Sequence, residues 1–137
     1  MNIKKENRKS IIDEIKFSIE KMKDKENDDP KAKLYYFSAV YAVIHRIFNI
    51  DYDDDLVFIH FVLLSTYNNT NARLQNPDPI IKIPDDYFDK LIAATEELLG
   101  VIVMDGNPYE VLRKFILLAY VTGGNGYYLY KKGLLKI

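Results

Sequence analysis

The sequence predicts an all-α fold, a compact bundle of about five helices formed by residues 1–137 as a single domain. Apolar residues recur at spacings of three and four in several long stretches, which is the period of an amphipathic helix. Three of these stretches are apolar on nearly every side, which is typical of buried helices. Most are preceded by Asp, Asn or Pro, the residues that favour helix starts. At this length, folding buries roughly 68% of the surface of the unfolded chain, enough for a core of its own.

The composition excludes several classes of protein. The chain contains no cysteine, which rules out disulfides, thiolate zinc sites and thiol catalysis. The formal net charge is -1, so no global basic field attracts nucleic acid. The first twelve residues are charged and lack the apolar core of a signal peptide, and no apolar run approaches the ~20 residues that span a bilayer. We therefore expect a cytoplasmic protein that does not bind membranes.

The first half of the chain predicts three helices. Residues 3–25 are amphipathic, with Phe17 opposite the apolar stripe. Residues 30–49 are apolar nearly all round and begin with capping aspartates before Pro30, so we expect a central, buried helix. Residues 56–70 follow a capping run of aspartates and are again apolar on most sides. The polar stretch after Tyr67 is compatible with either a frayed last turn or a loop.

The second half begins with an irregular segment. Three prolines in residues 76–84 forbid a helix, while residues 80–83 suit an extended or short edge-strand conformation. Residues 86–99 carry a helical stripe, and Gly100 stands where a C-cap is expected. Residues 101–104 suit a strand or a continued helix.

The last predicted helix spans residues 108–121 and is apolar nearly all round. Its start is marked by Asn107, by Pro108 at the first position and by Glu110. We expect this helix, 30–49 and 56–70 to form the interior, with 3–25 and 86–99 covering them.

The C-terminal residues 127–137 are compatible with a small β-hairpin or with a final irregular helix. Tyrosine favours strands, and the glycine at position 133 favours a turn, so the hairpin around Lys132 and Gly133 is the preferred interpretation.

Aromatic and basic side chains alternate in this tail. Tyrosine rings and lysines can stack bases and hold phosphates, can pack against a partner protein, or can simply cover the core of the domain itself. Together with the basic residues Lys4–Lys9, the tail supports a nucleic-acid hypothesis. The candidate residues are Tyr127, Tyr128, Tyr130, Lys131, Lys132 and Lys136.

The two histidines, His45 and His60, lie in the two most apolar predicted helices, an arrangement compatible with the two rings facing each other across the core. A pair of buried imidazoles is a candidate small-ligand or metal site. No Glu-x-x-His or His-x-x-x-His spacing accompanies them, so a hydrogen-bonded core histidine is favoured at each position. The aspartates of residues 51–55 imitate a calcium loop, but Leu56 replaces the required glycine, which favours helix capping. No cofactor is expected.

The leading functional hypothesis is a non-enzymatic helical protein–protein interaction module. Three helices with almost no polar side are too many for 137 residues to bury alone, so apolar surface is expected to be shared with a second copy or another protein. The alternatives are a nucleic-acid-associated protein that uses the two basic ends, and a ligand or metal site at His45 and His60. No catalytic residue is proposed.

Overall fold

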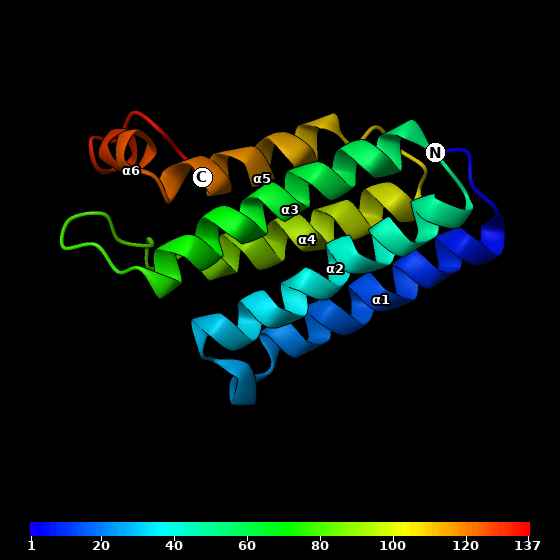
Figure 1. Ribbon diagram of the computed structural model, residues 1–137, viewed down its shortest axis with the longest axis horizontal. Coiled ribbons are helices and arrows are strands. Elements are labelled where there is room, and N and C mark those ends of the chain that lie inside the picture. The colour runs from blue at the N-terminus through cyan, green and yellow to red at the C-terminus, as the bar shows by residue number, and fades with distance from the viewer.

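The structure is a computed structural model that describes residues 1–137, and it contains six α-helices, one short 3₁₀ helix and no strand. It confirms the predicted all-α bundle (Figure 1). The elements are α1 (Lys5–Lys23), η1 (Lys25–Asn27), α2 (Pro30–Ile50), α3 (Asp54–Gln75), α4 (Tyr87–Val103), α5 (Tyr109–Val121) and α6 (Gly124–Lys131).

The five long helices form a ring around one core. α2 packs between α1 and α3, α5 packs between α3 and α4, and α4 returns to α1, while the short α6 packs against α5 at one end of the bundle (Figure 1). The core contains 25 buried apolar residues drawn from all five long helices. The expected division into three interior and two covering helices is therefore wrong. Each helix in a ring has only two neighbours, so one side stays in solvent whatever its composition.

The aspartates predicted at the starts of α2 and α3 cap these helices, whereas α5 begins at Tyr109, with Pro108 instead of Asn107 as its N-cap. The Asp29 side chain accepts a hydrogen bond from the Lys31 backbone N–H, and Pro30 occupies the first turn of α2. The Asp53 side chain accepts from the backbone N–H of Leu56 at 3.1 Å and caps α3. These local side-chain bonds satisfy N–H groups that a helix cannot satisfy by itself.

Two helices continue beyond their predicted ends because tertiary packing holds them. In α3, the buried Thr70 donates to the Thr66 carbonyl and also bonds the hydroxyl of Tyr87 from α4. In α4, Ile102 is fully buried, so the helix runs through Gly100 instead of ending there. Asp105 then adopts a φ of 53°, and the N–H of Gly106 bonds the Val101 carbonyl, which ends α4 in a Schellman motif.

The preferred hairpin interpretation of the tail is wrong, because residues 124–131 form α6. Gly133 has a φ of 76° and ends this helix: its N–H bonds the Tyr130 carbonyl, and the N–H of Leu134 bonds the Leu129 carbonyl. The left-handed glycine that suggested a hairpin turn serves as a helix C-cap, a role that needs the same backbone conformation. Residues 76–84 are irregular, as predicted, and residues 80–83 pair with no strand.

Candidate interaction surface

Charge is distributed unevenly around the ring. The outward sides of α1 and α4 carry lysines, aspartates and glutamates, such as Lys9, Asp13 and Glu96. By contrast, residues 34–45 of α2, residues 56–72 of α3 and residues 115–130, from α5 to α6, contain no Asp, Glu, Lys or Arg. Because α2, α3 and α5 are consecutive in the ring, one side of the bundle is almost free of charge.

Large apolar side chains are exposed on this side. Phe61 points outward from α3 and is 58% exposed, and Phe58 packs against Tyr109 of α5 with ring centroids 5.8 Å apart. Ile116 of α5 is 50% exposed and lies two helical turns beyond Tyr109. The charged Arg113 and Lys114 of α5 line the cleft toward α4. Arg113 follows Tyr109 by four residues and precedes Ile116 by three, so it also borders the stripe that these two residues form. We call this surface the uncharged face; its exposed members are His45, Phe58, Phe61, Tyr109, Ile116 and Tyr120.

The seam between α2 and α3 on this face is an aromatic cluster around His60. The His60 ring lies 5.0 Å from that of His45, 5.3 Å from that of Phe48 and 6.0 Å from that of Tyr41. Phe61 borders the same ring at 4.9 Å. The two histidines therefore meet, which the sequence left open, and they do so at the outer seam instead of across the core.

The expectation of two hydrogen-bonded core histidines is wrong in detail. His45 is exposed and its Nε2 lies 3.4 Å from the amide nitrogen of Asn49. His60 is 7% exposed, and its buried Nδ1 has no hydrogen-bond partner. Burial in this apolar seam lowers the pKa of His60, and repulsion from His45 lowers it further.

The histidine pair does not have the geometry of a metal site. The rings stack with an interplanar angle of 29°, so their nitrogen lone pairs lie in nearly parallel planes instead of converging on one point. No group of three or more His, Cys, Asp or Glu side chains surrounds a common position in this structure. Zinc sites use at least three protein ligands, so the arrangement favours packing over coordination.

We expect the stability of the fold to depend on pH through His60. The lowered pKa means that the unfolded chain binds a proton more readily than the folded chain, so stability is present above about pH 6.5 and is lost as the pH falls. The rings that face His60 are those of His45, Tyr41 and Phe48 from α2 and of Phe61 from α3; none of these residues is a carboxylate. The slope is at most about 1.4 kcal/mol per pH unit for one proton.

Urea denaturation at pH 7, 6 and 5 measures this effect. The His60→Leu variant should lose most of the slope, whereas His45→Gln should keep most of it, because burial is the larger cause of the lowered pKa. The aspartates whose pKa values are lowered, Asp51, Asp78 and Asp105, act mainly below about pH 5, and they contribute equally in both variants. An unchanged slope in His60→Leu would contradict the assignment.

The six tail residues do not form one site. Tyr127 and Tyr130 are half-buried, while Tyr128 is exposed with the Lys132 ammonium 5.1 Å above its ring centroid. Lys131 lies in a groove beside residues 76–84. Lys136 lies away from them, in the cleft between α4 and α5.

The basic N-terminal residues lie at the opposite end of the bundle from α6 (Figure 1). Arg8 pairs with Asp105 at 3.3 Å, and Lys9 pairs with Asp13 at 2.6 Å, so part of this basic charge is compensated within the chain. The two basic segments consequently share no common surface. Asp51, one of the calcium-like aspartates, accepts hydrogen bonds from the backbone N–H of Lys4 and from the Asn7 side chain.

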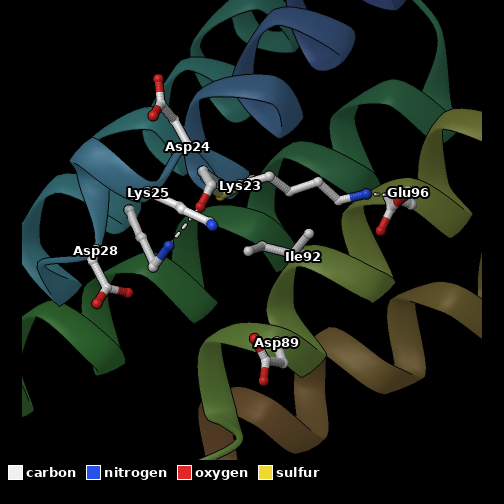
Figure 2. A pocket seen from close by; sticks show the side chains of 9 residues that line it. Lys23, Asp24, Lys25, Asp28, Asp89, Ile92 and Glu96 are labelled. Atoms are coloured by element: carbon white, nitrogen blue, oxygen red, sulfur yellow. Dashed lines mark hydrogen bonds and ion pairs between the residues drawn. The ribbon is translucent and has the colours of Figure 1, made fainter.

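A polar hollow of about 540 Å³ lies between the α1–α2 connection and α4. Figure 2 shows lysines and carboxylates interleaved around it, with Lys23 reaching across to Glu96 at 2.9 Å. Asp24, Asp28 and Asp89 belong to the same lining as Lys25 and Lys33, so the numbers of opposite charges nearly balance. This balance leaves no strong field of one sign for a charged ligand.

The sequence predicted that apolar surface would be shared with a partner, but it did not locate that surface. The charge-free runs were visible in the sequence and were interpreted as the sign of interior helices. No protein-family model, curated protein or solved structure matches this chain. None of the helices combines the length and the apolar character that crossing a bilayer requires. The fold and the site define a class only: a small ring of helices with one aromatic side that carries little charge.

Proposed function

We propose that this protein is a non-enzymatic interaction module that works in the cytoplasm and binds another protein through its uncharged face, either as a homodimer or as a small subunit of a larger assembly. The observation that carries the proposal is the outward side of α3, where 17 consecutive residues, 56–72, contain no charge while Phe58 and Phe61 are exposed. The cores of protein interfaces are depleted in charged residues and enriched in aromatic ones, which is the composition seen here.

Association through this face would remove apolar surface from water with little electrostatic cost. Each square ångström of apolar area buried contributes about 25 cal/mol, and charged groups would oppose burial because they must be desolvated. A homodimer brings two identical faces together, so like charges on the face would repel each other. This face carries almost no charge, and it is therefore compatible with pairing to a second copy.

The oligomeric state tests the proposal. Sedimentation equilibrium of the full chain from 1 to 200 μM should show self-association, and Phe61→Glu should raise the dimer Kd at least about tenfold, since it places a charge in a desolvated position. Phe17→Glu is the matched control, because Phe17 is an equally large ring that is 47% exposed but lies on α1, in the charged half of the ring. Its Kd should match that of the unchanged chain.

A photo-crosslinking amino acid at position 61, compared with one at position 17, distinguishes the two kinds of partner. Crosslinks from position 61 to a second copy support the homodimer, and crosslinks from position 61 to one other protein in native cells support the subunit. A chain that stays monomeric up to 200 μM and crosslinks equally from both positions would overturn the proposal.

A further inference from the structure

The part of the uncharged face that lies over α2 and α3 contains a stacked pair of imidazoles. The His60 ring lies 5.0 Å from the His45 ring and 4.9 Å from the Phe61 ring, so a single ring separates His45 from Phe61. His45 is exposed, whereas His60 is buried. Imidazole is the side chain whose charge ordinarily changes between about pH 5 and 8. A face with almost no charge therefore contains an exposed group that can gain a positive charge near neutral pH.

The side chains that face this pair from α2 are aromatic or neutral. Tyr41 and Phe48 border the His60 ring, and Phe48 also borders the His45 ring at 5.1 Å. The remaining polar neighbour of His45 is the amide of Asn49. Burial raises the pKa of Tyr41, so its hydroxyl stays neutral at neutral and acidic pH. None of these groups supplies a negative charge to a protonated imidazole.

The charged residues closest along the chain do not supply one either. Three aspartates between α2 and α3 already accept hydrogen bonds from N–H or O–H groups of this chain, namely Asp51, Asp53 and Asp54. Asp55 precedes His60 by five residues and so lies about 140° away around α3. Arg46, beside His45 on α2, is exposed and has the same sign as a protonated ring.

The charged residues of α1 and α5 belong to helices that pack against other sides of α2 and α3. Phe58, which contacts α5, lies two residues before His60 and thus about 200° away around α3. Tyr36, which contacts α1, lies nine residues before His45 and thus about 180° away around α2. A proton on His45 is therefore not compensated from any helix packed against this seam.

A charge on His45 has different consequences in the separate chain and in a pair of chains. In the separate chain His45 is exposed, so water solvates the protonated ring. Pairing through the uncharged face would bury His45, and an uncompensated charge is costly to bury. His60 is buried already, so pairing changes its surroundings much less. In a symmetric pair each copy contributes one His45, which doubles the effect.

On the basis of the proposed function, we infer that His45 makes the pairing of two copies through the uncharged face dependent on pH. The pair forms while both His45 rings are neutral, and it separates when they are protonated. The separate chains bind protons more readily than the pair, so proton linkage fixes the direction of the effect. Association is strongest above about pH 7 and is lost as the pH falls through about pH 6.

Sedimentation equilibrium of the full chain at pH 7.5 and pH 5.5 tests this regulation. The dimer Kd should be at least about tenfold higher at pH 5.5, because pairing must release up to one proton from each copy. His45→Gln, which keeps a neutral polar side chain, should have a Kd that agrees within about twofold at the two pH values. Arg46→Gln is the matched control, because it removes an adjacent exposed charge that does not titrate in this range. Its Kd should keep the pH dependence of the unchanged chain.

His45→Lys provides a second variant, with a positive charge at both pH values. Its Kd at pH 7.5 should reach that of the unchanged chain at pH 5.5, and the position is exposed, so the fold of the separate chain is preserved. Far-UV circular dichroism at pH 5.5 should match that at pH 7.5. Loss of helix together with loss of pairing would overturn the inference, because unfolding would then explain the separation.

The remaining outcomes distinguish this inference from the proposed function. A chain that pairs with the same Kd at both pH values overturns the pH regulation and leaves the proposed function standing, as does a pH dependence that persists in His45→Gln. A chain that does not pair at pH 7.5 overturns the pH regulation together with the homodimer form of the proposed function. The pH dependence of unfolding assigned to His60 should survive in His45→Gln, so folding and pairing respond to different histidines.

Discussion

Substitution of Gly126 by alanine is expected to detach α6 from the bundle. Gly126 is buried, and a Cβ there would lie 2.0 Å from the carbonyl oxygen of Tyr120 and 2.8 Å from its Cδ1. The carbonyl belongs to the backbone of α5 and also accepts the N–H of Gly123, so it cannot rotate away. The helix must shift instead, at a cost of about 2–3 kcal/mol for an overpacked position.

Hydrogen exchange and denaturation together measure this change. Amides 124–131 should exchange much faster in Gly126→Ala, and the thermal midpoint should fall, while the five-helix ring keeps its far-UV circular dichroism. Gly100→Ala is the control: it also replaces a helical glycine, but no atom lies within 4 Å of the new Cβ. It should raise stability by about 0.5–1 kcal/mol, because alanine loses less backbone entropy than glycine on folding. Equal behaviour of the two variants would contradict the packing described for α6.

The second large effect is expected at the centre of the ring. Phe37 of α2 is fully buried and stacks on Phe115 of α5, with ring centroids 5.9 Å apart and an interplanar angle of 29°. α2 and α5 are not neighbours in the ring, so this pair spans its middle. Phe37→Ala leaves a cavity lined by several helices and should lower the free energy of unfolding by about 3–5 kcal/mol.

Urea denaturation of Phe37→Ala at pH 7 measures this loss, which is a large share of the ~5–15 kcal/mol typical of a domain. Tyr35→Ala is the matched control because Tyr35 is an aromatic residue in the same helix that is 68% exposed. Its effect should stay within about 0.5 kcal/mol. A loss at Phe37 no larger than that at Tyr35 would mean that α2 presents a different side to the core.

The comparison of glycines shows where local sequence stops being informative. Gly100 lies inside α4, Gly126 allows two helices to touch, and Gly133 ends α6 with a positive φ of 76°. Glycine permits all of these roles, since it lacks a Cβ and accepts both signs of φ. The choice among them depends on residues far along the chain, such as the burial of Ile102 and the position of Tyr120.

The candidate surface shows the same limit for hydrophobic pattern. Phe37 and Phe61 both lie in charge-free stretches of their helices, yet Phe37 is at the centre of the core and Phe61 is 58% exposed. A helix face that packs in the core and a face that is exposed on the uncharged side both exclude charge, so composition does not separate them. His45 and His60 show the same limit: their rings are adjacent in one seam, yet His45 is exposed and His60 is buried.

The sequence by itself determined the all-α class, the starts of α2 and α3 and the stretches that contain no charge. These features depend on side chains bonding backbone groups two or three residues away and on helical periodicity, and both operate over a few residues. Only the tertiary structure decided which sides of the nearly all-apolar helices α2, α3 and α5 face inward, where α3 and α4 end and how the tail folds. A ring of five helices leaves each of them one solvent side, and that geometry is a property of the assembly of helices and not of any one of them.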